Sequence, residues 1–263
     1  GGAGVQYGNG AVGGVINIIT NGGTKSINQA STTYGSWGTL INNAILKNTV
    51  DKTTYQISAN TSNTNGWRAN TAANAYSIDA KISQSLGGND RVYLDAFYGY
   101  TNSQLAGPVL GLVGTGDPRS LDPKRPYDVG KNLTVKTSGF RQGLTKTINS
   151  KYIVEFDSSY STKNASFYTP QSDYFAGFGY VDSPRNNDLQ GWQVSASPRV
   201  KANFGVFGSS VVGYDYSKAS QSSVGSYSPL AQEIILANQN TNYFNNLLSN
   251  TQNATQINQS IYF

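Results

Sequence analysis

Residues 91–101 read Arg-Val-Tyr-Leu-Asp-Ala-Phe-Tyr-Gly-Tyr-Thr, and this stretch decides the fold class. Every second residue from Val92 to Tyr100 is apolar or aromatic, whereas Arg91 and Asp95 lie in the alternate positions. Because successive side chains of a β-strand point to opposite faces of the sheet, the alternation predicts a strand with one apolar and one wet face. This strand would be about twice the usual length of roughly 5–6 residues. Such a length suits a tilted strand that crosses a bilayer.

The same alternation recurs in Tyr76–Ser83, Lys151–Ser161 and Trp192–Lys201. Counted along the chain, the pattern predicts about ten strands between Lys25 and Phe263. The connections alternate between two kinds. The short ones are Val50–Asp51, Gly87–Asp90, Ile148–Ser150 and Phe204–Gly205, and the long ones are Asn63–Asn70, Ser103–Gly130, Asn164–Asp188 and Ser220–Thr255. Outer-membrane barrels have short periplasmic turns and long outer loops, so we expect an all-β, antiparallel transmembrane β-barrel.

Composition excludes several classes of function. The 263 residues contain neither Cys nor His, which excludes thiolate and imidazole metal sites and Ser-His-Asp triads within this sequence. No catalytic constellation is visible, so we expect no enzyme activity, no cofactor and no metal site. The net charge is +5, but the basic residues are scattered, which argues against a nucleic-acid partner. No stretch approaches the roughly 18 apolar residues that a membrane-spanning helix requires.

Residues Gly8–Gly13 match the G-x-G-x-x-G pattern of dinucleotide-binding proteins. That pattern requires a helix to begin at the last glycine and an acidic residue about 20 positions later. Here the β-branched run Val15–Thr20 follows directly, and the first acidic residue is Asp51. We therefore predict that Val15–Thr20 is a strand and that the glycines bind no nucleotide.

The same segment, Val5–Thr20, resembles the end of the plug domain of TonB-dependent outer-membrane receptors. The residues that carry the resemblance are Tyr7, Gly8, Gly13, Gly14 and Asn17. Weaker similarities to the barrel of that family follow in the same order at Gly66–Asn70, Ser197–Lys201 and Val211–Tyr216. The resemblance implies that residues 1–22 close the plug domain and that residues 23–263 form the N-terminal part of the barrel. It further implies that most of the plug precedes Gly1 and that about half of the barrel follows Phe263, since such receptors have about 22 strands.

The resemblance also implies a function. A receptor of this family captures a scarce solute, typically a ferric siderophore or a similar iron complex, and imports it with energy transmitted by TonB. The implied partners are TonB, through a plug region outside this sequence, outer-membrane lipid and a small metal-chelate ligand. The implied location is the outer membrane of a Gram-negative bacterium.

Candidate ligand-contacting residues combine positive charge with aromatic rings, which suits an anionic ferric chelate. They are Trp67, Arg68, Arg119, Lys124, Arg125, Tyr127, Tyr174 and Phe175. The alternative is that these loops are solvated or pack over the barrel mouth without contacting a ligand. Charged residues of the wet strand faces would contact the plug or only solvate the barrel interior; these are Asp79, Lys81, Asp95, Glu155, Asp157, Arg199, Lys201 and Asp215.

Other classes stay open on sequence alone. A passive porin or surface adhesin would share the barrel but lack a plug, and a secreted carbohydrate-binding β protein would share only the strands. An outer-membrane protease or lipase is a further alternative without a visible catalytic group. Ten strands closed on themselves would leave little room for a plug, because barrel diameter grows with strand number. We therefore expect an open, C-shaped wall in which Lys25–Tyr34 and Gln256–Phe263 do not pair.

Overall fold

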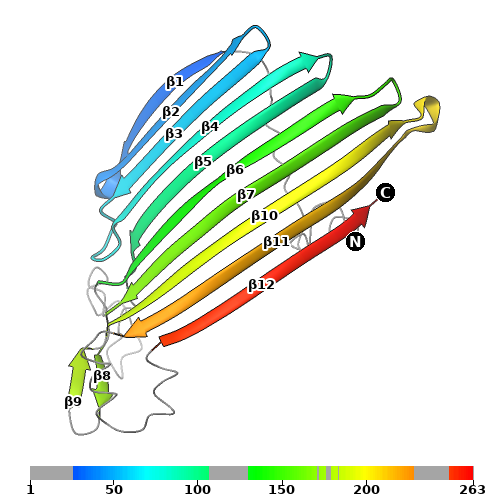
Figure 1. The fold of residues 1–263 in the computed structure, drawn as a ribbon. Helices are drawn as coiled ribbons and strands as arrows, with labels where there is room; N and C mark the ends of the chain where they lie inside the picture. The colour runs from blue at the N-terminus through cyan, green and yellow to red at the C-terminus, as the bar shows by residue number, and fades with distance from the viewer. Residues whose placement is uncertain are drawn as a thin grey trace.

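The computed structural model describes residues 26–106, 130–170, 172–175, 179–182, 184–227 and 249–262. These residues form one antiparallel sheet of ten long strands and a separate two-stranded hairpin (Figure 1). The strands of the sheet are β1 (Ile27–Gly35), β2 (Thr39–Val50), β3 (Thr53–Thr64), β4 (Ala73–Gly87), β5 (Asp90–Gln104), β6 (Asn132–Thr147), β7 (Tyr152–Thr169), β10 (Arg185–Asn203), β11 (Ser209–Tyr227) and β12 (Ser249–Tyr262). The hairpin consists of β8 (Ser172–Phe175) and β9 (Gly179–Asp182). Two 3-10 turns, η2 (Ser36–Gly38) and η4 (Gly205–Phe207), join β1 to β2 and β10 to β11.

The order of strands in the sheet follows the chain, with β10 beside β7 because the hairpin lies between them in sequence. β1 and β12 lie at opposite edges, and no described residue pairs one with the other (Figure 1). The all-β class, the ten strands and the open wall are therefore confirmed. Within the described ranges, no helix is long and apolar enough to cross a membrane.

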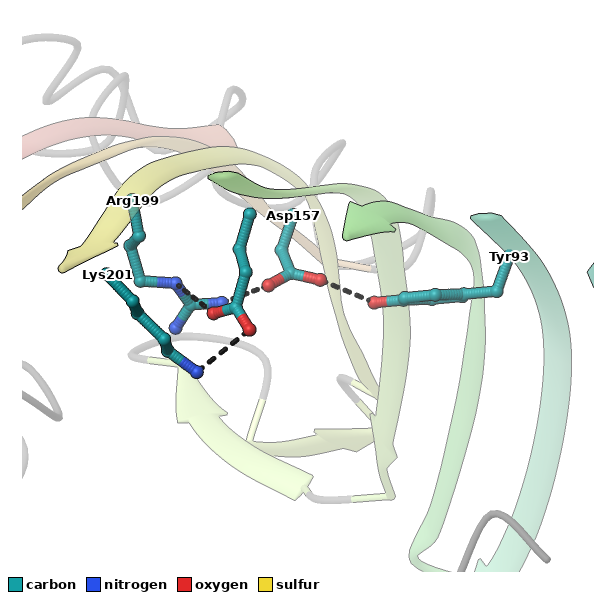
Figure 2. Close-up of polar contacts among 5 residues, drawn as sticks. Tyr93, Asp157, Arg199 and Lys201 are labelled. Atoms are coloured by element: carbon teal, nitrogen blue, oxygen red, sulfur yellow. Dashed lines mark hydrogen bonds and ion pairs between the residues drawn. The ribbon is translucent and has the colours of Figure 1, made fainter. Parts of the chain in front are cut away.

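The two faces of the sheet differ in the way that the alternation predicts. On β5, Val92 and Leu94 are 41% and 46% exposed, whereas Asp95 is 7% exposed. We call the face that carries Val92 and Leu94 the outer face, and the face that carries Tyr93 and Asp95 the inner face. Strand register keeps each face continuous: Leu94 lies opposite Ile82, and Asp95 lies opposite Lys81. The inner face is the concave side of the curved sheet, as the side chain of Tyr93 shows in Figure 2.

Large apolar side chains are exposed along the outer face of most strands. They include Leu46, Val50, Ile57, Tyr76, Ile78, Ile82, Val92, Leu94, Phe140, Leu144, Phe156, Tyr160, Trp192, Val200, Val212 and Ile257. No second layer of the described chain covers this face, since only the small β8–β9 hairpin lies outside the sheet. The sheet therefore has no core between layers, and its apolar face is left to the surroundings.

The predicted short turns are confirmed, but two predicted long connections are wrong in extent. Residues 164–188 were expected to form one connection, yet β7 continues to Thr169, β10 begins at Arg185, and the β8–β9 hairpin lies between them. Likewise, β11 continues to Tyr227 and β12 begins at Ser249. The alternation of apolar residues ends before the strands do, because Ser, Thr and Asn continue the ladder with polar cross-strand pairs. One example is the pair of Ser138 and Thr162 hydroxyls, 2.8 Å apart.

Several expectations lie outside the described residues. They are the plug motif at Tyr7, Gly8, Gly13, Gly14 and Asn17, the strand at Val15–Thr20 and the domain division after residue 22. These stay predictions.

The turn between β4 and β5 is fixed by two glycines and one carboxylate. Gly87 and Gly88 have φ of 109° and 57°, a region in which L residues are strained. Asp90, which follows the turn, receives hydrogen bonds from Lys146 Nζ and from the backbone N–H of Thr147, both at 2.6 Å. These bonds to its charged form lower the pKa of Asp90 from 3.8 to about 2. The carboxylate therefore joins the start of β5 to the end of β6.

This shift predicts a pH dependence of stability. Because the folded-state pKa is below the unfolded one, Asp90 stabilises the fold fully above about pH 4, and this contribution is lost as the pH falls toward 2. The free energy of unfolding of the full-length protein, measured with urea in detergent micelles between about pH 5 and about pH 2, should show this loss. Asp90→Asn should weaken stability above pH 4 and flatten the profile below it. Identical profiles for the two proteins would exclude the carboxylate as the cause.

Candidate functional site

The inner face carries a polar network in which ion pairs join β7 to β10 and a hydrogen bond reaches β5 (Figure 2). Lys201 Nζ on β10 lies 2.8 Å from Glu155 Oε1 on β7, and Arg199 contacts both Glu155 and Asp157. Asp157 also accepts a hydrogen bond of 2.8 Å from the hydroxyl of Tyr93 on β5. The phenol thus extends the network from β7 past β6 to β5.

A second cluster lies on the same face around Arg141 of β6. Its guanidinium is 3.1 Å from Asp95 Oδ2 and 3.8 Å from Asp79 Oδ2. The guanidinium also lies 5.1 Å from the ring centre of Phe97, within the range of a cation–π contact. Lys81 Nζ lies 4.9 Å from the ring centre of Tyr93, which brings this cluster close to the first network.

Two glycines of β6 make room for the aromatic rings of β5. Gly143 lies opposite Tyr93, and a Cβ built on it would collide with the Tyr93 ring and lie 2.5 Å from Asp157 Oδ1. Gly139 lies opposite Phe97, and its Cβ would be 2.8 Å from Phe97 Cζ. The rings of Tyr93 and Phe97 therefore lie across β6 along the wall, which any side chain at the two glycines would prevent.

The network has the chemistry of a hydrated, charged wall. Side chains such as Arg141 and Lys201 keep 53% and 46% of their surface exposed, so their ion pairs are partly screened by water. Among the described residues, no group of three acidic, His or Cys side chains could hold a metal ion. The arrangement suits polar, exchangeable contacts with whatever occupies the concave side.

All of the charged residues that were predicted for the wet face lie on the inner face. Seven of them belong to the two clusters just described, and Asp215 lies opposite Ser260 near the β12 edge. Their placement is confirmed, whereas their role toward a plug stays a prediction. The glycines at 139 and 143 were missed, because their importance depends on the register of β5 against β6 rather than on local pattern.

Of the predicted ligand-contacting residues, the structure describes the side chains of Trp67 and Arg68. Both belong to the turn between β3 and β4, at the end of the sheet where the long connections emerge. Trp67 is 47% exposed, and the Arg68 guanidinium carbon lies 5.8 Å from its ring centre. Trp67 is therefore exposed, whereas its sequence neighbour Arg68 is half-buried, and the two form a cation–aromatic pair.

The remaining candidates cannot be assembled with this pair. Tyr174 and Phe175 lie in β8, opposite Tyr180 and Gly179, and their side chains are outside the described part. The others also lie outside the described residues; they are Arg119, Lys124, Arg125 and Tyr127. A residue that the predicted set omitted is Asn70, whose side chain contacts both ends of the β5–β6 connection.

Comparison with solved structures identifies the architecture. The sheet superposes on the ferric-catecholate import receptor Fiu of E. coli K12 in its closed form, with a TM-score of 0.69 and 16% identity over 84% of this chain. The unliganded ferric citrate transporter FecA gives 0.70 and 16% over 87%, and the siderophore receptor PiuA of Acinetobacter baumannii gives 0.66 and 14% over 99%. The fold is that of the β-barrel wall in these three structures.

The chain corresponds to part of such a barrel wall. It covers 35% of Fiu, 34% of FecA and 43% of PiuA. No protein-family model and no curated protein sequence matches the chain. At this level of identity the shared property is the fold, and it agrees with the receptor fold that the sequence resemblance implies.

The glycines of the barrel wall give a direct test of the inner network. Gly143→Ala should displace the Tyr93 ring, break its hydrogen bond to Asp157 and lower the free energy of unfolding by about 1–3 kcal/mol through overpacking. Urea unfolding of the full-length protein in lipid vesicles measures this change.

Gly191→Ala on the inner face of β10 is the matched control. A Cβ there would lie no closer than 3.4 Å to its neighbours, so stability should stay level or rise by about 0.4–1 kcal/mol. Equal losses in the two variants would mean that the close approach of Tyr93 to β6 contributes nothing specific.

Proposed function

We propose that this chain is part of an outer-membrane receptor that imports a ferric siderophore or a similar iron complex. The observation that carries the proposal is the fold: an open, ten-stranded antiparallel wall with an exposed apolar outer face and a charged inner face. The matched structures are an import receptor for ferric catecholates, a ferric citrate transporter and a siderophore receptor. No role as an enzyme is proposed.

A membrane location follows from the outer face. Soluble monomers rarely expose contiguous apolar patches larger than about 300–600 Å². Here large apolar side chains such as Ile57, Ile78 and Leu94 are 45–49% exposed on neighbouring strands. In hydrocarbon every backbone polar group needs an internal partner, and a continuous antiparallel ladder supplies one for each strand within the sheet. Lipid is therefore the surroundings that this face fits.

The inner face supports an energised import mechanism. In this proposal a plug domain contacts the wall through groups such as Arg199, Asp157 and Arg141, and TonB pulls on the plug to open a path. Hydrated ion pairs on a wall exchange partners at little cost, since exposed pairs contribute only about 0–1 kcal/mol each. A wall of this kind would keep a plug in a defined position and still allow it to move.

The outer turn supports the choice of ligand class. Ferric siderophore complexes and ferric citrate are commonly anionic, and Arg68 beside Trp67 offers a cation and an aromatic face together at the outer end of the wall. The guanidinium group suits bidentate contacts with carboxylate or catecholate oxygens. In this proposal the iron complex is the cargo, and Trp67 and Arg68 of the turn contact its organic ligand.

Uptake by cells tests the proposal. The gene of the full-length protein would be deleted and restored in its iron-starved host, and uptake of radiolabelled iron supplied as ferric citrate or as a ferric catecholate would be measured. Restored uptake of at least one complex that stops when an uncoupler collapses the proton gradient is expected. Uptake of neither complex, or uptake that continues with the uncoupler, would contradict the proposal, and the second result would favour a passive porin.

The membrane assignment makes a separate prediction. Ile78→Arg places a charge on the outer face and should reduce assembly into the outer membrane, since such a charge costs about 2–4 kcal/mol near the bilayer midplane. Ser77→Arg adds the same charge one residue away on the exposed inner face and should assemble normally. The fraction of folded protein on heat-modifiable gels measures both. Equal assembly would argue against a lipid-facing outer face.

A further inference from the structure

Asn70 lies in the β3–β4 turn and holds the two ends of a different connection. Its Nδ2 donates to the carbonyl oxygens of Leu105 at 2.7 Å and Lys131 at 3.3 Å. Its Oδ1 accepts the backbone N–H of Gly130 at 3.1 Å. Leu105 follows β5 and Lys131 precedes β6, and we call these two ends of the β5–β6 connection its roots. One amide group therefore joins the β3–β4 turn to both roots.

The backbone of the turn is shaped to present this side chain. Asn70 has φ of 58°, a left-handed conformation that asparagine tolerates better than most residues. Gly66 has φ of 75°, and a Cβ at this position would collide with the Thr71 hydroxyl. The Thr71 hydroxyl in turn donates to the carbonyl of Arg68 at 2.6 Å and accepts a hydrogen bond of 3.4 Å from the backbone N–H of Arg68. The segment between Gly66 and Thr71 is thus folded on itself, and the side chain of Asn70 points to the two ends of the β5–β6 connection.

The turn is also tied on its other side. The backbone N–H of Asn65 donates to the carbonyl of Trp37, at 3.0 Å, in the β1–β2 turn. A Cβ at Gly38, which has φ of 66°, would approach Asn65 Nδ2 to 2.6 Å, so these two turns are in close contact. The β1–β2, β3–β4 and β5–β6 connections are therefore joined at the end of the sheet where the long connections emerge. The exposed Trp67 and the half-buried Arg68 lie between the two attachments.

We propose that Asn70 is a positioning residue that locks the β3–β4 turn onto the roots of the β5–β6 connection and so holds Trp67 and Arg68 in place for a ligand. The inference rests on the proposed function for the identity of the ligand. A side chain that must be ordered on binding costs affinity, and a turn that is already fixed avoids that cost. Asn70 contacts no ligand itself in this mechanism.

Asn70→Gly is the informative variant, because glycine accepts the left-handed backbone without strain and removes the side chain that makes the three hydrogen bonds. In the full-length protein it should weaken binding of ferric citrate or a ferric catecholate by about fivefold or more, as expected when two side chains must be ordered on binding. It should also speed hydrogen exchange of the Gly130 and Arg68 amides. Asn70→Asp keeps the acceptor for Gly130 but loses the N–H donors to Leu105 and Lys131. It should therefore also bind more weakly than the unaltered protein.

A double-mutant cycle separates positioning from general stability. In a protein that carries Trp67→Ala and Arg68→Ala, Asn70→Gly should cause no further loss of affinity, because the groups it positions are gone. An equal loss in both backgrounds, or unchanged exchange at Gly130 and Arg68, would overturn the proposal. If the unaltered protein binds neither iron complex, the proposed function fails, whereas the exchange rates still decide whether Asn70 locks the turn.

Discussion

The backbone ladder is the constraint on which the rest of this structure depends. Each interior strand exchanges hydrogen bonds with a neighbour on both sides, from β2 through to β11. Because the ladder satisfies the polar backbone within one layer, no second layer is needed to cover it. Side chains are then free to differ completely between the two faces. One stable sheet can therefore carry an apolar outer face and a charged inner face, because its backbone hydrogen bonds are satisfied within the sheet itself.

A single layer also changes how charged side chains are stabilised. In a two-layered domain they would be excluded from the space between layers, but here the concave side is wet and the ion pairs run along the wall between adjacent strands. The register sets these pairs: Glu155 lies opposite Arg199, and Asp95 lies opposite Arg141. Where β6 has glycine at 143, the ring of Tyr93 crosses the strand and reaches Asp157. The wall is thus cross-linked by side chains that lie along its surface.

The sequence predicts those features that depend on a period of two. The alternation seen around Leu94 and Asp95, repeated along the chain, predicts the two faces and the number of strands, and the breaks in it predict the short turns. Strand ends were predicted less well, since β7 continues after the apolar alternation stops and β10 begins before its own alternation starts. Gly143 and Asn70 could not be assigned roles from sequence, because their partners Tyr93 and Leu105 are distant in sequence and are brought near by the pairing of strands. Local pattern identifies a strand, whereas non-local register identifies a contact.

The outer end of the wall obeys a different rule from the wall itself. Beyond the last ladder hydrogen bond, a turn is ordered only if side chains or close backbone contacts replace the missing partners. Asn70 does this with one amide group for two carbonyl oxygens and one N–H group, and Thr71 does it within the turn. The Trp67–Arg68 pair is therefore held by a few side-chain hydrogen bonds rather than by the sheet. The residues of such a turn can therefore change while the strands of the sheet stay the same.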